Sequence, residues 1–160
     1  MKNLLSFFMA MLLCQTFAMA QTNEKPFVVP ELTQWHGASG SMKPSGRIVV
    51  TNKKLMKTAQ DLKRDYSLLF GGELTVTTSK ASNGDIVLAM KQDKKLGKEG
   101  YRLAIGDKCQ ITAASTTGAF WATRTVLQML QGQKGLPCGE AVDVPQYGMR
   151  GFMLDVGRKF

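Results

Sequence analysis

Residues 101–113, YRLAIGDKCQITA, contain two runs in which apolar and polar side chains alternate, separated by Gly-Asp-Lys. Strict alternation predicts two half-buried strands. A three-residue connection that contains glycine is typical of a β-hairpin. The stretch therefore predicts an antiparallel strand pair, with Cys109 and Ile111 on the inward face of its second strand.

The residues before this hairpin predict further strands. Residues 85–91 contain a continuous apolar run, which is typical of a strand covered on both faces. Residues 73–78 alternate, and residues 47–51 are rich in β-branched side chains. Because the strands from residue 73 onward are joined by turns that look too short for crossovers, we expect a mostly antiparallel sheet.

Two helices are expected, one between the first and second predicted strands and one after the last. Residues 53–70 predict an amphipathic helix that ends at Gly71 and Gly72. Its apolar stripe consists of Leu55, Ala59, Leu62, Tyr66 and Leu69. Residues 118–131 predict a second helix, with Thr116 or Thr117 as its N-cap. The inward side chains of this second helix are expected to be Phe120, Leu127 and Leu130.

The remaining segments contain residues that favour loops. Residues 22–46 hold three prolines and three glycines, and we expect loop and short extended pieces there. Residues 132–139 are expected to be a loop because they hold Pro137 and several glycines. The order of elements predicts an α+β fold for residues 21–144: a two-layer sandwich of a mostly antiparallel sheet with both helices on one face.

The first 20 residues have the features of a signal peptide. Lys2 gives a positive start, residues 4–13 are apolar, and residues 18–20 form an A-x-A cleavage site before Gln21. The apolar run is too short to predict a membrane-spanning helix. A lipid anchor at Cys14 is an alternative, although leucine precedes it where a small residue is normally needed. We expect an exported protein, periplasmic or extracellular.

The chain is basic, with a net charge of +9. Cleavage after residue 20 would remove one charged side chain, Lys2, and leave a net charge of +8. The lysines of residues 53–64 and 91–98 are interspersed with acids, which is typical of a solvated surface. No aromatic residues or nucleic-acid motif accompany them, so nucleic acid is not an expected partner.

The chain does not have the residues of a metal or redox site. His36 is the only histidine, and no C-x-x-C pair is present. Cys109 and Cys138 remain after signal cleavage, and the sequence leaves open whether they form a disulfide. We therefore expect no cofactor and no metal.

The closing segment, residues 145–160, has a different character. Residues 149–156 have the length of a strand, and three consecutive apolar residues predict cover on both faces. Such a strand normally opens a parallel α/β system, which implies partner strands outside these residues. Arg150, Asp155 and Arg158 flank the run. Asp155 and Arg158 could simply pair at a surface edge or could have a functional role.

The residues RGFMLDVGRKF, 150–160, resemble the start of the catalytic barrel of the β-N-acetylhexosaminidases of glycoside hydrolase family 20. Lys159 stands where that family usually has histidine. Residues 98–103 and 118–130 are similar to the family's N-terminal non-catalytic domain, in the same order. The resemblance covers residues 26–160 and implies that residues 145–160 begin a truncated (β/α)8 barrel.

This resemblance also implies roles for single residues. Arg150 would donate hydrogen bonds to hydroxyl groups of a terminal N-acetylhexosamine, with Asp155 and Arg158 as supporting residues of the motif. The family's reaction is substrate-assisted, with an Asp-Glu pair on a later barrel strand. That pair has no counterpart here, so the chain alone is expected to contain no catalytic residue and to be inactive. Its glycan substrate would be bound by the full-length enzyme.

Two other hypotheses belong to different functional classes. A free-standing exported module could bind a glycan or a partner protein. A basic protein could bind anionic surfaces, and its binding would then depend steeply on salt. The closing motif favours the hexosaminidase, because function is argued from sites rather than from net charge.

Overall fold

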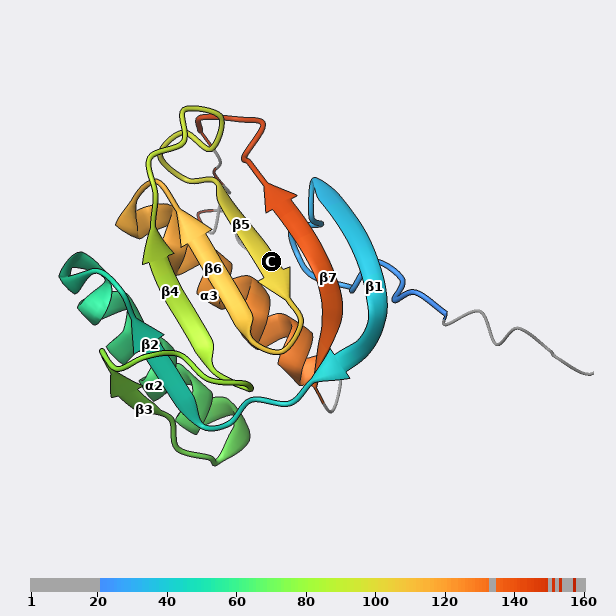
Figure 1. The fold of residues 1–160 in the computed structure, drawn as a ribbon. Coiled ribbons are helices and arrows are strands. Elements are labelled where there is room, and N and C mark those ends of the chain that lie inside the picture. The colour runs from blue at the N-terminus through green and yellow to red at the C-terminus, as the bar shows by residue number, and fades with distance from the viewer. Residues whose placement is uncertain (1–20, 133–134, 150, 152, 154–156, 158–160) are drawn as a thin grey trace, which may run out of the picture.

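The computed structural model describes residues 21–132, 135–149, 151, 153 and 157, and these residues form one sheet and two α-helices (Figure 1). The sheet has seven strands in the order β1-β7-β5-β6-β4-β2-β3. The strands are β1 Gln34–Met42, β2 Arg47–Val50, β3 Thr75–Thr77, β4 Ile86–Met90, β5 Tyr101–Ile105, β6 Cys109–Ala113 and β7 Leu136–Asp143. The helices are the short 3-10 helix η1, Lys53–Leu55, followed by α2, Met56–Phe70, and α3, Thr116–Gly132.

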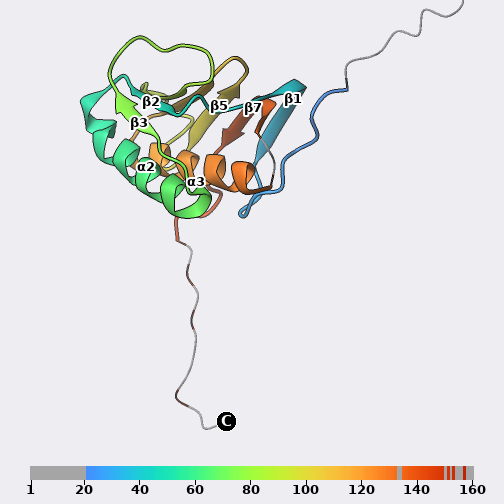
Figure 2. The same ribbon diagram turned by 90° about the horizontal axis from the view of Figure 1, so that it is seen from below.

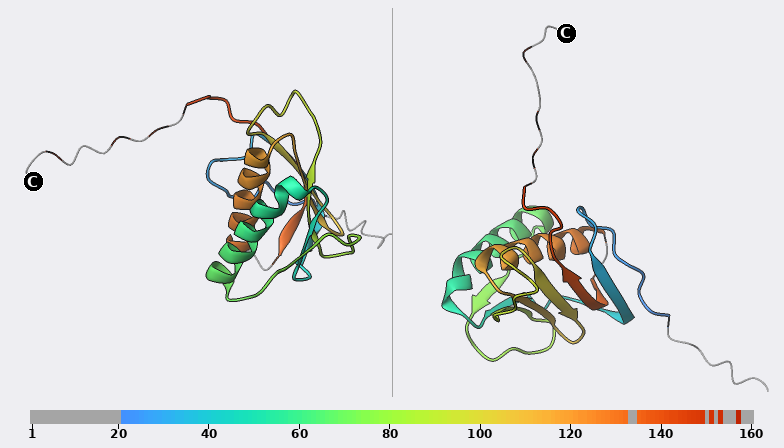
Figure 3. Two further views of the ribbon diagram at one scale, coloured as in Figure 1. Left: turned by 90° about the vertical axis from the view of Figure 1, so that its left-hand side faces the viewer. Right: turned by 90° about the horizontal axis from the view of Figure 1, so that it is seen from above.

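The molecule has two layers. Figure 2 and Figure 3 show α2 and α3 side by side across one face of the sheet, which confirms an α+β fold with both helices on the same side. The core fills the space between the layers. It is built from inward residues of both, including Ile48, Leu88, Leu103 and Ile111 from strands and Leu62, Ala122 and Val126 from helices.

The expectation of a mostly antiparallel sheet is wrong, because the sheet is mixed. The pairs β1·β7, β5·β7 and β5·β6 are antiparallel, whereas β2·β3, β2·β4 and β4·β6 are parallel. Consecutive strands are not always neighbours: β3 and β4 lie on opposite sides of β2, and β6 lies between β4 and β5. The predicted hairpin of residues 101–113 is confirmed as the β5·β6 pair.

Two strands form where loops were expected. β1 and β7 pair with each other at one end of the sheet, although their sequences contain glycines and Pro137. The register shifts between Gly37 and Ser41, next to the pair of Ser41 with Pro137, and such an irregularity accommodates a residue without an N–H. At Gly139 a Cβ would lie 2.6 Å from the Trp35 ring, so the glycine lets this indole lie against the strand.

The helix ends follow local capping rules. The chain leaves α2 through Gly71, whose φ of 68° is left-handed and whose N–H donates to the Ser67 carbonyl, as predicted. The N-cap of α3 is Ser115 rather than Thr116 or Thr117, since its Oγ accepts a hydrogen bond from the Gly118 N–H at 3.1 Å.

Candidate functional site

The structure does not describe the predicted substrate-binding residue, Arg150, or the two predicted supporting residues. Arg150, Asp155 and Arg158 lie outside the described residues, as does most of the proposed first barrel strand. Their roles stay predictions. Two features of the described part remain as candidates: a charged network between the two helices and a hollow beside α3.

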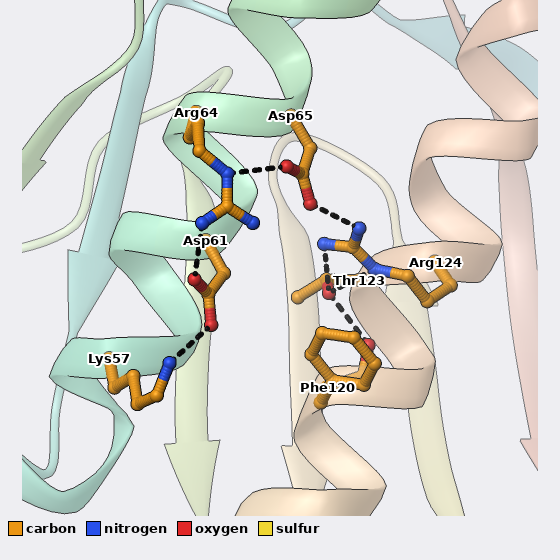
Figure 4. Close-up of polar contacts among 7 residues, drawn as sticks. All are labelled: Lys57, Asp61, Arg64, Asp65, Phe120, Thr123 and Arg124. Atoms are coloured by element: carbon orange, nitrogen blue, oxygen red, sulfur yellow. Dashed lines mark hydrogen bonds and ion pairs between the residues drawn. The ribbon is translucent and has the colours of Figure 1, made fainter.

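The charged network joins α2 to α3 (Figure 4). On α2, Asp61 accepts from Lys57 at 3.3 Å and from Arg64 at 3.1 Å, and Arg64 also donates to Asp65 at 2.9 Å. The other carboxylate oxygen of Asp65 accepts from Arg124 of α3. The ion pair between Asp65 and Arg124 links α2 to α3.

The guanidinium of Arg124 is held from several directions. Its Nε and Nη2 donate to the Thr123 hydroxyl at 3.2 and 3.1 Å, and its Cζ lies 4.6 Å from the centre of the Phe120 ring. A planar guanidinium suits such a combination of ion pair and stacking. Arg124 therefore has a fixed position on the outer side of the helices.

The network is suited to packing rather than to proton transfer. Burial opposes ionisation of Asp65, but the hydrogen bonds from Arg124 and Arg64 outweigh it and lower the pKa of this carboxyl. A general acid needs a raised pKa near the working pH. Asp65 is therefore an ionised structural partner.

A hollow of about 350 Å³ lies beside Arg124, between α3, the segment before β1 and the end of β7. At its base the Tyr101 and Thr125 hydroxyls are 2.6 Å apart. Burial raises the pKa of the Tyr101 phenol, which therefore stays neutral. On its wall the Gln128 side chain accepts from the Val29 N–H at 2.8 Å and donates to the Val29 carbonyl at 3.0 Å. The hollow combines apolar walls with a few fixed polar groups, which suits the binding of another group.

Apolar side chains are exposed on α2, on α3 and in the segment before β1, and two of them, Val29 and Trp121, line this hollow. We use the name helix-side surface for Phe27, Val29, Leu68, Leu69 and Trp121. Leu68 is 77% exposed and Trp121 41%. Leu69 was predicted to face inward, but it is 51% exposed. It lies in the last turn of α2, near the end of the part of the helix that packs on the sheet. The segment that follows β7 leaves the domain on this same side (Figures 2 and 3).

The cysteines and the histidine do not come together. Cys109 and Cys138 are both free thiols, and burial raises the pKa of Cys109 to about 12. His36 is exposed on β1. Among the described residues, no three His, Cys, Asp or Glu side chains are grouped to hold a metal ion. In the same residues no helix has the length and apolar character needed to cross a membrane.

The sequence did not identify the network or the hollow. The charges on α2 were interpreted as a solvated face, and nothing in the sequence shows that Asp65 meets Arg124, 59 positions away. The spacing of apolar residues in 118–131 indicates a helix, but it does not indicate which element the helix contacts.

Comparisons with known proteins agree with the resemblance noted in the sequence. The family profile "Glycosyl hydrolase family 20, domain 2" matches residues 25–144. A lacto-N-biosidase of Bifidobacterium bifidum is 35% identical over 135 residues, which is 81% of this chain and 12% of that protein. The chain therefore spans about an eighth of that relative.

Solved structures show the same fold. A mutant Streptomyces plicatus β-hexosaminidase in complex with its product GlcNAc has a TM-score of 0.69 and 28% identity, over 89% of this chain and 31% of that one. The Flavobacterium johnsoniae chitobiase has a TM-score of 0.59 and 20% identity, over 91% of this chain and 24% of that one. The profile match over most of the chain shows that this protein belongs to glycosyl hydrolase family 20.

Proposed function

We propose that this chain supplies the N-terminal non-catalytic domain of an exported, exo-acting β-N-acetylhexosaminidase. The enzyme would remove terminal N-acetylglucosamine or N-acetylgalactosamine from glycans by substrate-assisted, retaining catalysis. Family membership and the names of the relatives, a lacto-N-biosidase and β-hexosaminidases, support a glycan substrate. The 160 residues alone would be inactive, with the catalytic Asp-Glu pair in later sequence.

The helix-side surface is the observation that carries this proposal. Exposed apolar side chains grouped on one side of a domain mark an interaction site. Here Val29 and Trp121 line a hollow, and the chain passes the helix side of the domain as it leaves β7. The occupant we propose is the catalytic barrel that begins after residue 144. The helices would then lie between the sheet and the barrel.

Arg150 would link the two parts of the enzyme. It follows directly after the described segment that ends at Met149, at the start of the proposed first barrel strand. A planar guanidinium can donate to two neighbouring sugar hydroxyls, which suits recognition of the terminal residue. Asp155 and Arg158 would hold the end of this strand in place.

The coding DNA beyond the codon for Phe160 tests the proposal. We expect an open frame with alternating strands and helices and an adjacent Asp-Glu pair. The protein encoded by that longer frame should release p-nitrophenol from p-nitrophenyl N-acetyl-β-glucosaminide, whereas the 160-residue chain should not. A stop codon after Phe160, confirmed by the mass of the protein made in the native cell, would contradict the proposal and favour a free-standing binding module.

A further inference from the structure

Two groups of lysines that are far apart in the sequence follow neighbouring strands of the sheet. Lys53 and Lys54 follow β2, and Lys91, Lys94, Lys95 and Lys98 follow β4. All six side chains belong to exposed residues. We call these six lysines the basic edge.

The parallel register of the sheet places the starts of the two lysine-containing segments at the same end of the sheet. β2 and β4 are neighbours, with Val50 opposite Leu88. The Thr51 N–H continues this pairing by donating to the Leu88 carbonyl at 3.0 Å. The carboxyl ends of the two strands therefore lie side by side. In Figure 1 the chain after β2 turns to α2, whereas the chain after β4 continues into the loop that leads to β5.

Two acids, Asp93 and Glu99, stand among the lysines of the basic edge in the sequence. None of its six lysines takes part in an ion pair with another described residue. Lys57, which follows Lys54 closely in the sequence, does pair with Asp61. The nearby Asp93 is already occupied, since it accepts from the Lys95 N–H at 2.9 Å and from Arg102 at 3.1 Å. Its pKa is lowered by these hydrogen bonds, so it stays ionised beside Arg102.

A hollow of about 530 Å³ adjoins the basic edge on the sheet face away from the helices. It is lined by Lys91, Gln92, Asp93, Lys94, Leu96, Arg102 and Thr112. Arg102 and Thr112 are paired across β5 and β6, and Asp93 holds Arg102 in place. The hollow therefore presents positioned donors to solvent, next to lysines that have no partner among the described residues.

We propose that the basic edge and this hollow bind an acidic glycan through its carboxylate or sulfate groups. The proposal rests on the proposed function in one respect, because a glycosidase meets glycan chains. Charge complementarity supplies the attraction, and the fixed guanidinium and hydroxyl supply hydrogen bonds. The domain would then hold the polymer on which the rest of the enzyme acts.

The lining of the hollow favours a glycan over other polyanions. Among the described residues that line it, none is aromatic, so it offers no stacking platform for nucleic acid bases. Binding to an anionic membrane would be helped by an exposed apolar side chain at the rim, but Leu96 is 1% exposed. The polar lining consists of one hydroxyl, one amide, three cations and the Asp93 carboxylate that Arg102 binds, so its net charge is positive and suits acidic substituents.

Binding of size-defined heparin oligosaccharides and polysialic acid to the purified chain tests the proposal by calorimetry at several salt concentrations. The test variant is Lys91→Gln with Lys94→Gln. The matched control is Lys43→Gln with Lys80→Gln, which removes the same charge from exposed residues near the opposite end of β2. We expect the test variant to weaken binding about tenfold or more and the control to change it less than about twofold. Binding by the sulfated and the carboxylated probe separately would show which group is recognised.

Several outcomes would overturn the proposal. These are no binding of either probe, equal losses in the test and control variants, equal binding of neutral chitin oligosaccharides, or tighter binding of duplex DNA or of vesicles containing phosphatidylglycerol. Unchanged melting temperatures would show that both variants fold. A longer protein without hexosaminidase activity would refute the proposed function separately, while site-dependent glycan binding would still support this inference.

Discussion

Gly118, in the first turn of α3, lies directly against the carbonyl oxygen of Gly100, and a Cβ at residue 118 would collide with that oxygen. The contact joins residues 98–103 to residues 118–130, the two segments that resemble the family's N-terminal non-catalytic domain in sequence. Gly100 is itself crowded, because a Cβ there would collide with the Leu96 carbonyl. Close backbone contact thus explains both glycines: Gly118 lies against the carbonyl of Gly100, and Gly100 lies against the carbonyls of Leu96 and Asp143.

Gly118→Ala should destabilise the domain. The obstacle is backbone rather than a flexible side chain, so α3 would have to shift, at a cost of about 1–3 kcal/mol. Gly132→Ala is the matched control at the other end of the same helix, where a Cβ would meet nothing within 4 Å. Chemical denaturation of both variants measures the difference. Equal stabilities would show that the contact relaxes freely.

Asp65→Asn should weaken the link between the helices in a pH-dependent way. The pKa of Asp65 is lowered in the folded protein from an ordinary value of 3.8, so its ionised form contributes stability above that value. This contribution is lost as the pH falls through the lower, folded-state pKa. We expect the variant to lose about 1–2 kcal/mol near pH 7, and the difference from wild type to shrink below about pH 4.

Asp61→Asn is the control for that experiment. Among the residues that the structure describes, Asp61 pairs only within α2, through Lys57 and Arg64, and pairs of this kind contribute about 0.3–0.5 kcal/mol. Urea denaturation at several pH values compares the two variants. A loss at Asp61 as large as that at Asp65 would contradict a special role for the contact with Arg124.

The helix-side surface should tolerate charge in this chain. Leu68→Glu with Leu69→Glu replaces exposed apolar side chains, so the melting temperature of the 160-residue chain should change by no more than a few degrees while self-association falls. In the longer enzyme the same change should lower stability by disrupting packing on the barrel. Gln60→Glu is the control at an exposed position of the same helix. A large loss of stability in the short chain would show that these leucines already pack within the domain.

Local sequence patterns predicted the elements whose signals are local. The hairpin of residues 101–113, the strand at residues 85–91 and the helix that ends at Gly71 follow from periodicity and capping, and the structure confirms them. β1 and β7 were missed because glycines and Pro137 weaken their intrinsic strand signal, while pairing across the sheet supplies what propensity does not.

Strand neighbours and cross-helix contacts could not be predicted in the same way. Adjacency in sequence suggested antiparallel pairs, but β6 lies between β4 and β5 and pairs parallel with β4. The meeting of Asp65 with Arg124 depends on that three-dimensional order, and so does the placement of the two lysine groups after neighbouring strands. Contacts of this kind are set by the packing of the whole sheet and its helices.

Tyr101→Phe should change how stability depends on pH at the alkaline end. Burial, opposed by the hydrogen bond with Thr125 and reinforced by the nearby Asp143 carboxylate, raises the pKa of the phenol from its ordinary value of 10.0. A group with a raised folded-state pKa contributes stability that is present below its unfolded pKa and lost as the pH rises above it. Wild type should therefore lose stability between about pH 9.5 and 11 more steeply than the phenylalanine variant. Cys109 and the other tyrosines are present in both proteins, so their titration cancels in the comparison. Denaturation curves across this range measure the two slopes, and parallel slopes would mean that Tyr101 ionises as freely in the folded chain as in the unfolded one.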